Sequence, residues 1–175
     1  MKSKKRGYLL LEGIVSLFII VTLSLSFYYI LFFSNNYKNM IQNKVELYEQ
    51  GEEISFQINK LLENSKGIVS IRDTNGKTIF EDNKSYIKAE SIKCRYRDEY
   101  NKTEKDREIS FKRNNKLFIN TLNSGGGSEA GGYEIGDYVD SINIINNNNK
   151  ISIKLYLSKG SQKYETEFNS YIRMF

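Results

Sequence analysis

The N-terminal part of the chain combines a long apolar run with a helical stripe. Residues 13–33 carry no charged side chain and consist of apolar and small polar residues. At about 1.5 Å per residue these 21 residues would form a helix about 30 Å long, enough to cross a bilayer. Beyond them, apolar residues recur at three- and four-residue steps with one gap near Gly51, and this predicts an amphipathic helix. The stripe comprises Tyr37, Ile41, Val45, Tyr48, Ile54, Ile58 and Leu61.

No strong breaker separates the two segments, so we expect one long helix over residues 8–62. Its first half, residues 8–33, is apolar all round and suits a lipid or fibre core. Its second half lies within residues 34–66 and has an apolar stripe that should pack on a sheet. Gly67 follows a short polar segment and is predicted to cap the helix.

After Gly67 the pattern changes to short strands separated by turns rich in Asn and Gly. Strands are expected at residues 68–72, 77–80, 86–96, 108–112, 117–121, 138–145, 151–157 and 164–172. The intervening turns include an Asp-Thr-Asn-Gly hairpin at 73–76 and tight turns at 113–116, 146–150 and 158–161. Such short loops imply antiparallel neighbours. The sequence therefore predicts an α+β fold, in which a long N-terminal helix packs on an antiparallel β-sheet domain of residues 67–175.

The longest irregular segment is predicted at residues 123–137 and contains a glycine-rich run. Glycine-rich loops that cradle phosphate need a following helix N-terminus and usually a lysine. Neither follows this run, so a flexible exposed loop between two hairpin groups is the favoured interpretation.

Composition narrows the chemistry that the chain can perform. The single cysteine, Cys94, allows no intrachain disulfide, and the absence of histidine removes histidine-based triads and most zinc sites. No motif places a pair of carboxylates or a cluster of metal ligands, so we expect neither an enzyme nor a cofactor or metal site. Four of the 26 basic residues precede the apolar run, and the net charge of +5 is mostly theirs. The most basic stretch, residues 93–116, favours a solvated sheet surface, with DNA contact as the less favoured alternative.

Glu12 is the unusual feature of the apolar N-terminal segment. A carboxylate near the start of a membrane-length helix is costly and usually functional. It lies five residues after Gly7, which ends a short basic leader containing Lys2, Lys4, Lys5 and Arg6. Basic residues before the span place the N-terminus in the cytoplasm. A secretory signal peptide would have a shorter apolar region and a small-residue cleavage site, whereas a plain signal anchor leaves Glu12 unexplained.

The segment from Gly7 to Leu17 resembles the cleavage and methylation signature of the type IV pilin superfamily. This resemblance implies a leader of residues 1–7, an assembly helix beginning at Tyr8, cleavage between Gly7 and Tyr8 by a prepilin peptidase, and N-methylation of Tyr8. Two positions depart from the usual pattern, because the first mature residue is Tyr8 instead of phenylalanine and the second is Leu9 instead of a small hydroxyl residue. The order of helix and meander is also similar to that of PilW-type minor pilins and J-type pseudopilins.

The resemblance further implies a structural subunit with other pilin-like proteins as partners. In the fibre, the ammonium group of a neighbour's Tyr8 would neutralise Glu12 and set the axial register. A carboxylate that reaches the membrane interface is the alternative role for Glu12. We expect a single-pass membrane protein with an extracytoplasmic C-terminal domain, which reaches the cell surface after assembly. The other class of function is a membrane-anchored extracellular binding or sensing module that keeps its first seven residues.

Overall fold

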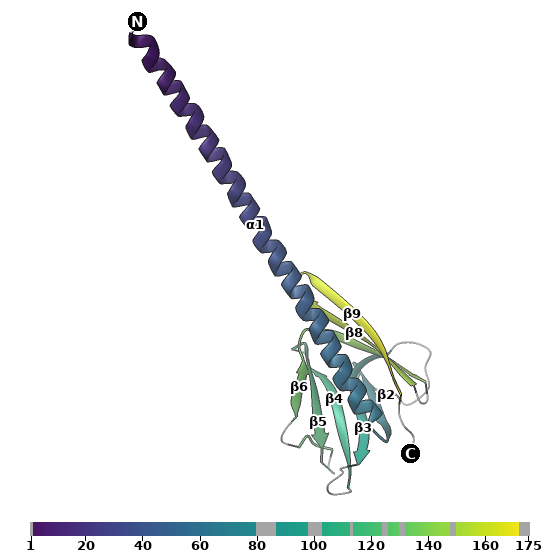
Figure 1. The fold of residues 1–175 in the computed structure, drawn as a ribbon. Coiled ribbons are helices and arrows are strands. Elements are labelled where there is room, and N and C mark those ends of the chain that lie inside the picture. Colours follow the sequence, from purple (N-terminus) through teal and green to yellow (C-terminus); the bar gives the residue numbers. More distant parts are fainter. Residues whose placement is uncertain are drawn as a thin grey trace. The chain divides into compact units, whose positions relative to one another are not determined.

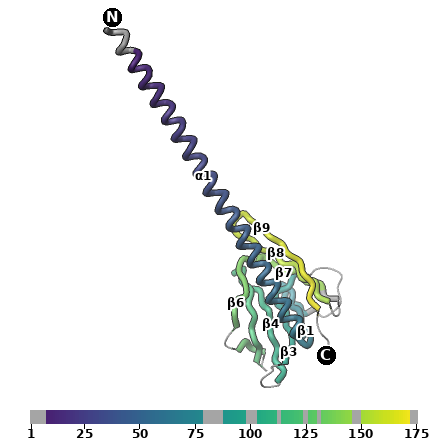
Figure 2. Tube along the Cα trace, in the orientation of Figure 1, coloured from purple at the N-terminus to yellow at the C-terminus, as the bar shows by residue number. Residues whose placement is uncertain are grey.

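A computed structural model describes residues 2–79, 87–97, 103–112, 114–123, 126–129, 132–147 and 150–171. The chain divides into two compact units, residues 1–42 and 43–175. Figure 2 traces the chain along both units. The helix α1 (Lys2–Glu63) begins in the first unit and ends in the second.

The second unit consists of the last turns of α1 and an antiparallel sheet (Figure 1). The described strands are β1 (Gly67–Asp73), β2 (Thr78–Ile79), β3 (Ile87–Arg97), β4 (Glu104–Lys112), β5 (Lys116–Leu122), β6 (Tyr133–Gly136), β7 (Val139–Asn147), β8 (Lys150–Lys159) and β9 (Gln162–Tyr171). This arrangement confirms the predicted α+β fold with an antiparallel sheet. Both predicted hairpins and the final meander are present, although Phe80, Tyr86 and Ile172 lie outside the described residues.

The sheet divides at β3, which has three strand partners. Ala89 pairs with Asp73 of β1 and with Ile142 of β7, so these two strands lie on opposite sides of β3. Ser91 pairs with β1 and with β4, so β4 also lies opposite β1. One edge of β3 therefore pairs with β7 near the start of β3 and with β4 further along β3. The strand order is β6-β5-β4-β3-β7-β8-β9, with β1 and β2 branching from β3.

The core of the second unit lies between α1 and one face of this sheet. Leu47, Ile54, Ile58 and Leu62 of α1 are fully buried. The strands contribute mainly isoleucine and leucine, among them Ile71, Ile92, Ile109, Leu117, Ile119, Ile142, Ile144, Ile151, Ile153, Leu155 and Leu157. Burial of one such side chain stabilises the fold by about 1.5–3 kcal/mol, so apolar packing dominates the attachment of this helical segment.

The helical stripe that packs on the sheet differs from the predicted one. Ile54 and Ile58 are buried as expected, but Val45 and Tyr48 are about half exposed, and Leu47 and Leu62 take their places in the core. Gly51 occupies the predicted gap and is itself buried, because the ring of Tyr164 in β9 fills the space beside it. A β-carbon at Gly51 would lie 2.6 Å from Cε1 of Tyr164. The glycine therefore lets the helix approach the sheet closely.

Two local expectations were wrong, and one predicted strand has an irregular alternation. Gly67 does not cap α1 but begins β1, and the hydroxyl of Ser65 closes the helix by donating to the carbonyl of Leu62 at 2.7 Å. In β3, Ala89 is buried and Lys88 exposed, because a bulge at the register shift opposite Arg72 and Asp73 changes the phase of the strand. The segment predicted to be irregular, residues 123–137, includes strand β6 at its end.

Candidate functional site

The residues predicted to be processed and paired lie in the first unit, on α1. The helix passes through the bond between Gly7 and Tyr8. Tyr8 is 70 % exposed and Glu12 is also exposed, one turn further along the same face of the helix. Exposed apolar side chains continue from Leu9 to Phe33. Within one chain Glu12 therefore has apolar neighbours, and none of the described residues forms an ion pair with it.

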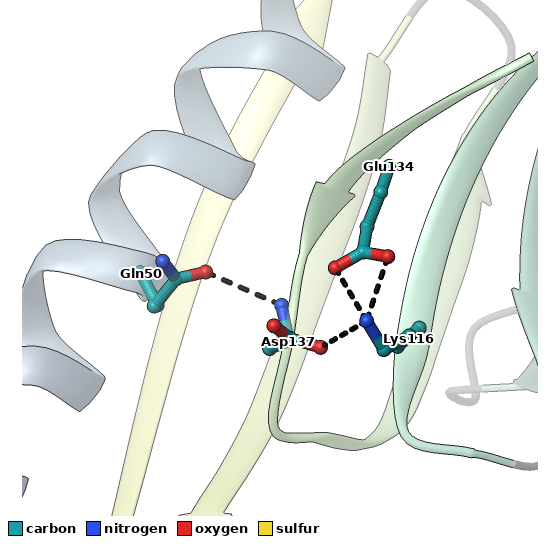
Figure 3. Close-up of polar contacts among 4 residues, drawn as sticks. All are labelled: Gln50, Lys116, Glu134 and Asp137. Carbon is teal, nitrogen blue, oxygen red and sulfur yellow. Dashed lines mark hydrogen bonds and ion pairs between the residues drawn. The ribbon is translucent and has the colours of Figure 1, made fainter.

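A polar network joins α1 to the β5 and β6 strands in the second unit (Figure 3). The side-chain oxygen of Gln50 accepts a hydrogen bond from the backbone N–H of Asp137 at 3.2 Å. The ammonium group of Lys116 lies 2.8 Å from Glu134 and 3.3 Å from Asp137. This network lies beside Gly136 and Ile54, at a close approach of helix and sheet. It fixes how the helix is positioned along the sheet, while the apolar core supplies most of the stabilisation.

A second polar contact joins α1 to the turn between β8 and β9. The carboxylate of Glu46 lies 2.5 Å from Nζ of Lys159, and the Lys159 ammonium also lies over the ring of Tyr138. The hydrogen bond to Lys159 lowers the pKa of Glu46, and the same bond raises the pKa of Lys159. Because both groups are solvated, this pair contributes to the orientation of the turn more than to stability.

The basic stretch of residues 93–116 is extensively ion-paired. Arg95 lies 3.0 Å from Asp106, Lys105 lies 3.2 Å from Glu129, and Lys116 is held by two carboxylates. Strand register also places Lys93 opposite Glu108 and Arg97 opposite Glu104 on the outer face of the sheet. These carboxylates reduce the positive potential of that face. DNA contact stays a prediction of the sequence.

A pocket of about 220 Å³, here called the α1-end pocket, lies where α1 ends over the inner face of the sheet. Its lining residues are Gln57, Lys60, Leu61, Asn64 and Ser65 of the helix end, Cys94 and Tyr96 of β3, Arg107 of β4, and Tyr133 of β6. Arg107 stacks on Tyr96, with its guanidinium carbon 4.0 Å from the ring centre. Sequence reasoning missed this pocket, because only the strand register brings residues from β3, β4 and β6 together.

Cys94 lies at the buried base of this pocket. Burial raises the pKa of its thiol to about 12, with a smaller contribution from Asp106. The thiol is therefore neutral at physiological pH and is a poor nucleophile. Among the described residues no cluster of Cys, Asp or Glu has the geometry to hold a metal ion.

The chain matches no protein-family model, no curated protein and no solved structure. The fold indicates with which class of protein the chain is compatible. Within the described residues, α1 is the helix that is long and apolar enough to cross a membrane. Together with the antiparallel sheet on which its last turns pack, this helix is compatible with a membrane-anchored, pilin-like protein.

Proposed function

We propose that this protein is a minor type IV pilin or pseudopilin, a structural subunit that helps to initiate or cap a fibre. The observation that carries the proposal is the spacing of Gly7 and Glu12 at the start of the apolar segment, on the same helix whose last turns pack on an antiparallel sheet. A plain membrane anchor accounts for the apolar segment but not for a carboxylate inside it.

Processing precedes assembly in this account. A prepilin peptidase cleaves between Gly7 and Tyr8 and methylates the new amine, which stays cationic. When the apolar helices gather in a fibre and exclude water, an unpaired Glu12 carboxylate would cost several kcal/mol. A neighbour's Tyr8 ammonium offsets that cost only at the correct axial position, so the pair selects the register of assembly.

A tip or initiation role is favoured over the fibre shaft by the glycine-rich segment before β6 and the Asn-rich turn between β7 and β8. Such segments are easily placed where one side of a subunit has no neighbour, and they are harder to repeat in every lateral contact. The partners are then other small pilin-like subunits, and the protein acts in the membrane and, after assembly, at the cell surface.

Co-expression with a prepilin peptidase tests the proposal against that of an unprocessed anchor. In a host without its own peptidase, the full chain should become shorter by seven residues only when the peptidase is present. Gly7→Leu should remain uncut, whereas the matched variant Gly13→Leu, beyond the cut site, should be processed like the parent. A parent chain that stays full-length with an active peptidase supports the unprocessed anchor instead.

A further inference from the structure

The α1-end pocket has an excess of positive charge. Arg107 and Lys60 both line it, and among the described residues no Asp or Glu does. Six other cations of this unit each have a carboxylate within 3.5 Å, namely Lys66, Arg95, Lys105, Lys116, Lys154 and Lys159. In the part of the chain that the structure describes, Arg107 and Lys60 contact aromatic rings, those of Tyr96 and Phe56, and form no ion pair.

Stacking on Tyr96 leaves the hydrogen-bonding groups of Arg107 available. A guanidinium that stacks on an aromatic ring uses its flat face, while its N–H donors point outward in its own plane. That planar fork matches the two oxygens of a carboxylate. The stacked tyrosine holds the fork in place, so less conformational entropy is lost when an anion binds.

The remaining lining residues fit a peptide. Leu61, Tyr96 and Tyr133 offer apolar surface, and the side chains of Gln57 and Asn64 offer amide groups for backbone hydrogen bonds. Tyrosine and arginine are enriched among the residues that dominate protein–protein binding energy. The volume of about 220 Å³ is smaller than the typical small-molecule site of about 300–1,000 Å³, so it suits one or two side chains of a larger partner.

We propose that the α1-end pocket binds an acidic peptide segment of a partner protein, with a carboxylate on Arg107 and Lys60 and an adjacent apolar side chain against Tyr96, Tyr133 and Leu61. All of these residues lie in the unit of residues 43–175. The proposal therefore goes beyond the function proposed above and holds whether or not the chain is processed as a pilin.

The test uses the full chain in detergent and two N-acetylated, C-amidated peptides, Phe-Glu-Phe-Glu and its uncharged counterpart Phe-Gln-Phe-Gln. Calorimetric titration should show binding of the acidic peptide, with affinity at least about tenfold lower for the uncharged one, the loss expected for one charge-assisted hydrogen bond. Arg107→Gln should lower the affinity for the acidic peptide by a similar factor. Arg97→Gln is the matched control, because Arg97 is an exposed arginine on the outer face of β3.

Lys60→Gln provides a second variant at an exposed helix position, should Arg107→Gln prevent folding as judged by circular dichroism. Lys60→Gln should lower the affinity for the acidic peptide and leave the affinity for the uncharged peptide unchanged. The proposal is overturned if both peptides bind equally, if the Arg107 and Lys60 variants bind like the parent, or if no binding occurs up to about 1 mM. Tighter binding of glucuronate or of a DNA duplex than of the acidic peptide would equally overturn it.

Discussion

Gly136 of β6 lies directly beneath the fully buried side chain of Ile54 in α1, and a β-carbon on the glycine would collide with Cγ1 and Cδ1 of that isoleucine. Ile54 cannot move aside without disturbing its neighbours in a close-packed core. Gly136→Ala should therefore destabilise the domain by about 1–3 kcal/mol, the usual cost of overpacking.

Denaturant titration of the full chain in detergent measures this effect. Gly127→Ala is the control, since the atoms nearest to a β-carbon there belong to Asn123, at an ordinary distance of 3.5 Å. The control should stay within about 0.5 kcal/mol of the parent. Equal stabilities for the Gly136 and Gly127 variants would contradict the close approach of helix and sheet.

Removal of the last turns of α1 should uncover the core. A fragment of residues 43–175 retains the buried helical residues Leu47, Ile54, Ile58 and Leu62, and it should be a folded, soluble monomer. A fragment of residues 67–175 leaves the apolar face of the sheet bare and should aggregate. Size-exclusion chromatography and circular dichroism distinguish the two. A well-folded monomer from the shorter fragment would refute the helix as part of the core.

Cys94 should report on folding through its reactivity. Because burial raises the pKa of its thiol from 9.0 to about 12, a thiol reagent at pH 8 should label the native protein very slowly and the denatured protein fully. Above pH 9 the unfolded chain loses this proton while the folded chain keeps it. The contribution of Cys94 to stability should therefore fall between pH 9 and about pH 12, and Cys94→Ala should lack that decline. Rapid labelling of the folded protein would show that the thiol is accessible.

The fold class could be predicted from the sequence, because turn chemistry and alternation locate most strands even without knowledge of their partners. The face of α1 that packs on the sheet could be predicted only in part, with Ile54 and Ile58 buried as expected. Apolar residues on neighbouring faces of the helix also fit the period, so the predicted stripe includes Val45 and Tyr48 and omits the buried Leu47 and Leu62. Gly51 forms a gap in the apolar pattern because it has no side chain. Its role depends on Tyr164, far along the chain.

The N-terminal processing site and the α1-end pocket also differ in how far the sequence predicts them. The spacing of Gly7, Tyr8 and Glu12 along one helix is visible directly in the sequence. The α1-end pocket depends on the register that places Cys94 opposite Arg107 and Ile119 opposite Tyr133. A bulge in β3 and the short β6 strand, whose Tyr and Ile alternate next to glycines, make that register unreadable from the sequence alone.

Glu12 should be dispensable for processing and required for assembly. Glu12→Leu leaves the cut site intact but removes the partner of a neighbour's Tyr8 ammonium, so it should be cleaved normally and be largely absent from fibres. Ser16→Ala, one turn further along the same face, is the control and should assemble like the parent. Immunoblots of sheared fibres and of membranes measure both properties. Normal assembly of Glu12→Leu would mean that the Glu12 carboxylate only extends to the membrane interface and does not pair with a neighbouring subunit.

The identity of the mature N-terminus is the most direct test of a pilin-like subunit. Intact-mass and peptide-level mass spectrometry of the protein from its native host reads this directly, without any assay of fibre assembly. We expect a chain that begins at Tyr8, lacks residues 1–7 and carries one methyl group on its terminal amine. A mature chain that begins at any other residue, or that retains Met1 through Gly7, would contradict the assignment as a pilin-like subunit.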